Sequence, residues 1–259
     1  MLYCLLSTFV GIHVALFDSG IGGLTVLHKA IEILPYENYI YYADTDHVPY
    51  GTKTKDQITD HVNHAAKFLS QFDLKALVLA CNTATSVVVR DLRKRYNFPI
   101  IGMEPAVKPA ITQSNKRVLV CATERTLQEE KLHNLILDLD ADTRVTLLPL
   151  QELVKLAEDS KFEYFEVQPV LERSLGGIDW HDYEYLVLGC THFLFFKEAF
   201  SYYLPPWIKI IDGNEGTILH LKSVITPQPT PTQFPIKYYQ SDRESESAYF
   251  EQFLKKLDS

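Results

Sequence analysis

Apolar residues along this chain fall into short runs that alternate with segments of helical periodicity. The runs are rich in Val, Ile, Leu and Tyr and predict strands at residues 12–17, 39–43, 76–80, 100–102, 117–121, 145–148, 185–189 and 209–211. Between them, apolar positions three or four residues apart predict helices at residues 24–33, 57–71, 85–96, 126–137 and 150–158. This alternation is typical of an α/β protein with mainly parallel sheets.

One phrase occurs twice, far apart in the chain. Residues 77–83 read LVLACNT and residues 186–192 read LVLGCTH. In each copy a strand-type run ends on a small residue, a cysteine and polar residues that favour the start of a helix. Eight strands can form one barrel or two open sheets. The duplicated phrase favours two sheets, each of the size of a flavodoxin-like lobe.

Prolines suggest where the chain crosses between these lobes. Phe98-Pro99 is the expected first crossing and Pro205-Pro206 the expected return, because proline stops helices and stiffens connections. We therefore expect a first lobe of residues 12–99 plus 208–259 and a second lobe of residues 100–207. The proline-rich tract at 226–235 predicts a loop before a last strand at 236–239 and a terminal helix from about 244 to 257.

Composition and charge narrow the classes of function. The chain has 259 residues and a net charge of −8, which argues against a nucleic-acid partner because phosphate binding needs clustered Lys and Arg. The apolar residues 1–10 lack a basic start and a cleavage site and are too short to cross a bilayer, so we expect a cytoplasmic protein without membrane contact. We interpret them as an extension of the first strand or the product of an upstream start codon.

The four cysteines are Cys4, Cys81, Cys121 and Cys190, and none has the paired spacing of a metal site or a disulfide framework. Cys81 and Cys190 each end a strand where a helix begins, and a helix N-terminus favours a thiolate. We interpret them as functional thiols and Cys121 as a buried structural residue. His192 stands next but one to Cys190, which suits tuning of that thiol or proton transfer beside it.

Two further loops follow predicted strands. Asp18 and Ser19 lead into a glycine-rich turn that lacks a nucleotide-binding spacing, and they offer an acid for an ammonium group or for a neighbouring thiol's proton. A Pro49-Tyr50-Gly51 turn follows the second strand, and loops after parallel strands converge on one crevice. The pair His61 and His64 has no third ligand in the sequence, so no metal site is predicted.

Together these motifs resemble the glutamate racemases, within the aspartate/glutamate racemase group that works without pyridoxal phosphate. The matching pieces are FDSGIGGL at residues 17–24, YYAD at 41–44, PYG at 49–51, ACNTA at 80–84 and LGCTHF at 188–193. Their order and spacing follow the family from about residue 12 to the terminal helix. Glu129-Glu130 and Leu132 replace the Ser and Tyr that the family has downstream of its threonine pair.

The resemblance implies two α/β lobes with the active site in the cleft between them, and a first lobe completed by the last segment of the chain. It implies one catalytic cysteine from each lobe, no cofactor, and free glutamate as substrate. The implied ligand-site residues are Asp18, Ser19, Pro49, Tyr50, Gly51, Asn82, Thr83, Thr123, Thr126, Thr191 and His192. Glu158 matches the family's histidine-orienting glutamate if a short insertion before it is allowed.

The expected reaction is racemisation of L- and D-glutamate, supplying D-glutamate for peptidoglycan. Cys81 and Cys190 lie on opposite faces of the α-carbon in this hypothesis, with Asp18 placed to tune Cys81 and His192 to tune Cys190. Three alternatives stay open: a related racemase of aspartate or another small amino acid, a one-cysteine decarboxylase, and a catalytically silent regulator. A homodimer is also left open.

Overall fold

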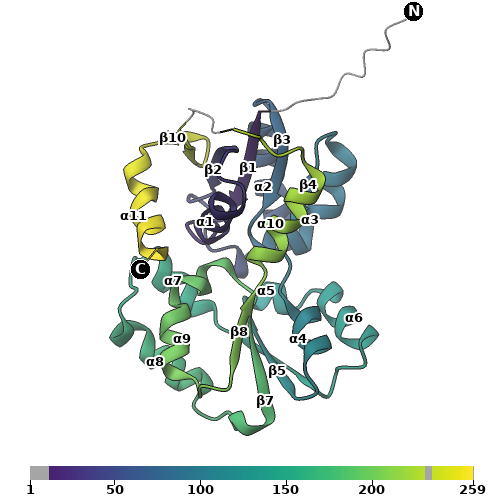
Figure 1. Cartoon of the computed structure of the whole chain (residues 1–259), viewed down its shortest axis with the longest axis vertical. Coiled ribbons are helices and arrows are strands. Elements are labelled where there is room, and N and C mark those ends of the chain that lie inside the picture. The colour runs from purple at the N-terminus through teal and green to yellow at the C-terminus, as the bar shows by residue number, and fades with distance from the viewer. Residues whose placement is uncertain (1–11, 231–234, 259) are drawn as a thin grey trace, which may run out of the picture.

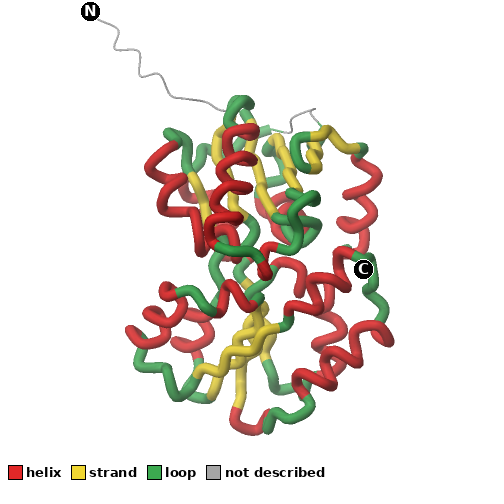
Figure 2. The backbone as a smooth tube through the Cα atoms, turned by 180° about the vertical axis from the view of Figure 1, so that it is seen from behind, coloured by secondary structure: helices red, strands yellow, loops and turns green. Residues whose placement is uncertain are grey.

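A computed structural model describes residues 12–230 and 235–258 of the chain, so residues 1–11, with Cys4 and the proposed strand extension, lie outside it. Two sheets lie one above the other, with helices around both (Figures 1 and 2). The larger sheet has the order β10-β9-β2-β1-β3-β4 and the smaller has β6-β5-β7-β8. The α/β class with two mainly parallel sheets is therefore confirmed.

The larger sheet is parallel except for its last edge, where β10 pairs antiparallel with β9. Every residue of β2 is buried, and β1 and β3 are buried almost throughout, because helices cover both faces of these apolar runs. Its strands are β1 (His13–Asp18), β2 (Asn38–Ala43), β3 (Leu74–Leu79), β4 (Ile100–Gly102), β9 (Lys237–Gln240) and β10 (Arg243–Ser245).

The smaller sheet is parallel throughout. Its strands are β5 (Arg117–Ala122), β6 (Val145–Pro149), β7 (Tyr183–Leu188) and β8 (Lys209–Asp212).

Eleven α-helices and three short 3₁₀ helices occur in the described residues. They are α1 (Leu24–Ile33), η1 (Tyr50–Thr52), α2 (Lys55–Leu69), α3 (Asn82–Arg95), α4 (Val107–Gln113), α5 (Glu124–Leu127), α6 (Glu130–Asp138), α7 (Gln151–Glu158), α8 (Tyr164–Leu175), η2 (Trp180–Asp182), η3 (Thr191–Phe196), α9 (Lys197–Tyr203), α10 (Asn214–Val224) and α11 (Ser247–Leu257).

We call residues 12–102 and 214–258, around the larger sheet, the first lobe, and residues 107–212, around the smaller sheet, the second lobe. These limits correct the sequence-based ones by a few residues. Strand β4 was expected to open the second lobe but pairs with β3, and β8 pairs with β7 rather than joining the first lobe. The chain thus crosses between the lobes one strand later than the prolines suggested: after β4 rather than before it, and after β8 rather than before it. As the resemblance implied, its last segment returns to the first sheet, through β9.

Two helices differ from the periodicity in an informative way. The helix expected at residues 126–137 is divided into α5 and α6 around Gln128 and Glu129. Helix α8 was not predicted because Pro169 lies inside it and cannot donate an intrahelical hydrogen bond.

Carboxyl ends of strands from both sheets meet between the lobes. Asp18, at the end of β1, accepts a hydrogen bond from Thr191, just after β7, at 3.1 Å. Thr83, just after β3, contacts Thr123, just after β5, at 2.9 Å. In Figure 1 helices α5 and α7 lie at this middle level of the molecule. The strand ends of the two lobes therefore face one another.

Candidate active site

Cys81 follows β3 and caps the first turn of α3. The backbone N–H of Ala84 donates to its Sγ at 3.4 Å, and the thiol contacts the Ser19 hydroxyl at 3.8 Å. Burial raises the pKa of Cys81 to about 12, and the nearby charge of Asp18 adds to the rise. The helix start was expected to favour the thiolate, but its N–H group only partly offsets the burial. Burial therefore keeps this thiol neutral.

Cys190 follows β7 and begins the 3₁₀ helix η3 rather than an α-helix. Its Sγ lies 3.8 Å from Nδ1 of His192, whose Nε2 lies 2.6 Å from Oε1 of Glu158. Burial lowers the pKa of His192, but the contacts with Cys190 and Glu158 outweigh it and hold that pKa well above its usual value. A chain of thiol, imidazole and carboxylate thus leads from the second sulfur to Glu158.

Glu158 also joins the lobes. Its Oε1 accepts a hydrogen bond of 2.9 Å from the backbone N–H of Ile21 in the glycine-rich turn. Gly22 of the same turn is packed so closely that a Cβ would lie 2.4 Å from Nδ1 of His192. The turn after β1 therefore holds the imidazole from the opposite lobe, and only glycine leaves room for it.

Asp18 and Ser19 connect the residues around one thiol to those around the other. The Asp18 carboxylate accepts from the Gly20 N–H at 2.9 Å and from the Thr191 hydroxyl at 3.1 Å. It is completely buried, and this burial raises its pKa to about 6. Ser19 contacts the Cys81 thiol, and Asp18 contacts Thr191, the residue that directly follows Cys190. Cys190 is a further, smaller contributor to the raised pKa of Cys81.

Three threonine hydroxyls form a triangle where the two lobes meet. Thr83 contacts Thr123 and Thr126 at 2.9 and 3.1 Å, and Thr123 contacts Thr126 at 3.0 Å. All three residues are buried. A set of hydroxyl donors enclosed in this way is suited to bind a carboxylate.

The Pro49-Tyr50-Gly51 turn packs against the second lobe. A Cβ on Gly51 would lie 2.8 Å from Cβ of Thr123 and would also collide with the amide of Gln151, so glycine allows this close approach. The Tyr50 side chain is buried and donates its hydroxyl to Asp44 at 2.6 Å. Its hydroxyl therefore serves to anchor the turn.

The structure gathers most of the residues predicted for the site at this junction of strand ends. Asn82 begins α3 and borders a small cavity that Thr126 also lines. Cys121 is buried in the core of the second lobe, where burial raises its pKa, as its structural interpretation requires.

Sequence reasoning missed Gln151 here, and it noted Glu129 only as a replacement of a family residue. Glu129 is buried, and the Oε1 atom of Gln151 is buried without a hydrogen-bond partner among the described residues. The available signal for Gln151 was its position, as a polar residue soon after a predicted strand.

Asp44, His47 and His61 gather near the Pro-Tyr-Gly turn, with ligand atoms within 4.8 Å of one another. Nδ1 of His47 is bonded to Asp44 at 2.8 Å, and the two imidazoles are stacked with centroids 3.7 Å apart and planes 21° apart. In-plane lone pairs of nearly parallel rings do not converge on one point. This geometry favours a hydrogen-bonded ring stack over a coordination site.

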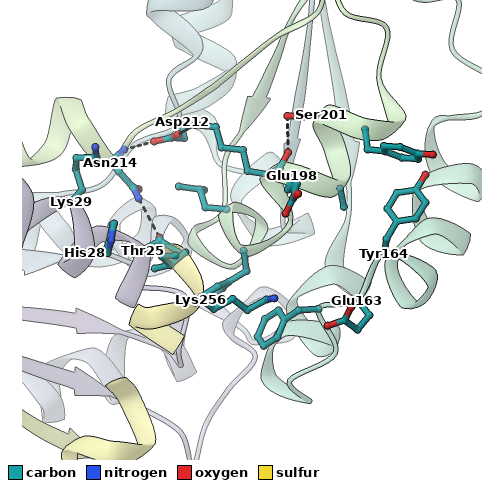
Figure 3. Close-up of a pocket in the computed structure, with 17 residues that line it drawn as sticks. Thr25, His28, Lys29, Glu163, Tyr164, Glu198, Ser201, Asp212, Asn214 and Lys256 are labelled. Atoms are coloured by element: carbon teal, nitrogen blue, oxygen red, sulfur yellow. Dashed lines mark hydrogen bonds and ion pairs between the residues drawn. The ribbon is translucent and has the colours of Figure 1, made fainter. Parts of the chain in front are cut away.

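A separate groove of about 930 Å³ lies away from the thiols (Figure 3). Residues of both lobes line it, among them Thr25 and Lys256 from the first and Tyr164 and Glu198 from the second. Neither Cys81 nor Cys190 is part of its wall. No helix in the described part of the chain is long and apolar enough to span a membrane.

Comparison with known proteins identifies the class that this fold and site define. Residues 25–219 match the family model described as Asp/Glu/hydantoin racemase, and the chain belongs to that family. The chain is 50% identical to the glutamate racemase of Halothermothrix orenii over 214 residues, which cover 82% of this chain and 85% of that protein.

Solved structures of glutamate racemases have a similar fold. The glutamate racemase of Campylobacter jejuni superposes with a TM-score of 0.80 at 29% identity, covering 95% of this chain and 98% of that one. The Escherichia coli glutamate racemase, solved with L-glutamate and the activator UDP-MurNAc-Ala, superposes with a TM-score of 0.78 at 28% identity, covering 87% of each chain. Within its family, the chain is thus similar to glutamate racemases.

Proposed function

We propose that this protein is a cofactor-independent glutamate racemase of the cytoplasm, which supplies D-glutamate for peptidoglycan. One observation carries the proposal: the consecutive residues Asp18 and Ser19 contact Cys81 on one side and the neighbour of Cys190 on the other. We expect a ligand held at this dipeptide to have a thiol within reach from each lobe. The 50% identity to a glutamate racemase supports glutamate as the substrate.

In the proposed reaction, the thiolate of one cysteine removes the α-proton and the thiol of the other delivers a proton to the opposite face of the carbon. Each turnover therefore exchanges one proton and inverts the centre. The substrate ammonium brings a positive charge to two buried thiols and so favours the thiolate that burial alone disfavours. Asp18 is the candidate partner of this ammonium group.

Developing negative charge on the α-carbon requires stabilisation without a cofactor. Buried hydroxyl donors supply this by preorganisation, at about 3–4 kcal/mol for a good donor in an enclosed site. The threonine triangle is the candidate site for one carboxylate of the substrate. His192, held by Glu158, is the candidate proton-transfer partner of Cys190. We further propose that the two lobes act as domains that close around the substrate and exclude water.

The test is to follow the optical activity of L-glutamate and of D-glutamate by circular dichroism with the purified protein, and to repeat the assay with both aspartate enantiomers. We expect both glutamate enantiomers to converge on the racemate, with deuterium entering the α-position in heavy water. Faster racemisation of aspartate would overturn the substrate, and no racemisation of any amino acid would favour a silent regulator.

A further inference from the structure

An ion pair joins the two lobes beside the proposed site. Nζ of Lys55, the first residue of α2 in the first lobe, lies 2.9 Å from Oε2 of Glu129, which stands between α5 and α6 in the second lobe. The Glu129 side chain is only 7% exposed, whereas that of Lys55 is 52% exposed. A surface lysine of one lobe therefore covers a buried carboxylate of the other.

Glu129 depends on this contact. Nε of Arg125 lies 3.1 Å from its other oxygen, but neither atom is in hydrogen-bonding geometry, and both are buried without a hydrogen-bond partner in the described part of the chain. A buried carboxylate is costly unless it is both paired and hydrogen-bonded. Lys55, from the opposite lobe, thus completes the pairing of Glu129, and separation of the lobes would remove it.

The position of this pair links it to the substrate. Lys55 follows the Pro49-Tyr50-Gly51 turn by one short segment, and the N–H of Glu129 donates to the carbonyl of Thr126 at 3.3 Å. Its two ends are therefore attached to the turn in the first lobe and to the threonine triangle where the lobes meet. The ion pair thus holds these two segments together.

We propose that Lys55 and Glu129 are positioning residues that hold the lobes closed, so that both thiols are kept at the substrate's α-carbon. This inference rests on the proposed racemase function for its role in turnover, but the closure itself does not require it. The buried thiols report on closure, because Cys81 and Cys190 are only 6% and 7% exposed. Opening of the lobes would expose both, whereas Cys121, 0% exposed inside the second lobe, would stay protected.

The experiment measures the alkylation rate of each cysteine by iodoacetamide and peptide mass spectrometry, without glutamate. The variants are Lys55→Met, Glu129→Gln, their combination, and Lys55→Glu. The matched control is Lys67→Met, which removes an exposed lysine from the same helix. We expect each of the first two variants to raise the rates of Cys81 and Cys190 by about five- to tenfold, the effect of an ion pair of about 1 kcal/mol.

The combination should be no faster than Glu129→Gln alone, because both changes break one interaction. Lys55→Glu should be faster than Lys55→Met, since it places two carboxylates together. Racemisation kinetics give the second readout: KM for glutamate should rise by a similar factor while kcat stays within about threefold. A general structural defect would instead also expose Cys121.

Alkylation rates equal to those of the wild type and of Lys67→Met would overturn the inference. If the rates rise but no variant and no wild-type protein racemises glutamate, the closure by Lys55 and Glu129 stands and the assigned reaction falls. Failure of the two proposals is therefore distinguishable.

Discussion

Gly22→Ala provides a sharp test of how the site is held, because the change is a single methyl group far from both thiols in the sequence. The new Cβ would lie 2.4 Å from Nδ1 of His192 and 2.5 Å from Oγ1 of Thr191. Ordinary contact begins near 3.4 Å, so the imidazole must move by about 1 Å. That movement disturbs the 3.8 Å contact with Cys190 and the 2.6 Å contact with Glu158.

A misplacement of about 1 Å in a catalytic group typically costs about 100-fold in rate. We therefore expect kcat of Gly22→Ala for glutamate to fall by about 100-fold in the circular dichroism assay, with a stability loss of about 1–3 kcal/mol from overpacking. The matched control is Gly216→Ala in α10, where an added Cβ meets nothing within 4 Å. Gly22→Ala with more than half of the wild-type kcat would refute the role of this turn in holding His192.

Two further predictions concern the acids Glu158 and Asp18. Glu158→Gln removes a partner that raises the pKa of His192, so kcat should fall by about 100-fold and the limb of the pH–rate profile that belongs to His192 should move to lower pH; an unchanged profile would argue against the pairing. The pKa of Asp18 is raised from 3.8 to about 6 in the fold. The free energy of unfolding is therefore greatest while this acid is protonated. It falls by about 3 kcal/mol in total as the pH rises from about 3.8 through about 6. Asp18→Asn, which does not titrate at this position, should thus unfold at higher urea than the wild type at pH 8 and at about the same urea at pH 4. A wild type that gains stability relative to Asp18→Asn between pH 4 and pH 8 would contradict the burial argument.

The sequence is most informative where chemistry is local. The runs that end on Cys81 and Cys190 predict strands β3 and β7 and place each thiol at a strand end. A short buried strand can be recognised from the spacing and type of its apolar residues alone. The glycine-rich turn after β1 is readable for the same reason. These local signals were sufficient for the fold class and for placing each thiol just after a strand.

Contacts between the lobes are beyond such reasoning. The contact of Glu158 with the Ile21 N–H and the pairing of Lys55 with Glu129 join residues distant in the sequence, and their approach depends on how the lobes pack together. The pKa of Cys81 illustrates the same limit. A helix start lowers a thiol's pKa, but burial outweighs that effect, and burial is a property of the packed structure.

The central claim is that proton removal and proton return belong to two different sulfurs. Its most direct test is the racemisation rate of purified Cys81→Ser and Cys190→Ser with each glutamate enantiomer, alongside Cys121→Ser as a buried control. We predict that the first two variants lose turnover with both enantiomers, because an alcohol is too weak an acid to take the place of either thiol, while Cys121→Ser remains active. Wild-type racemisation by either Cys81→Ser or Cys190→Ser would contradict the account.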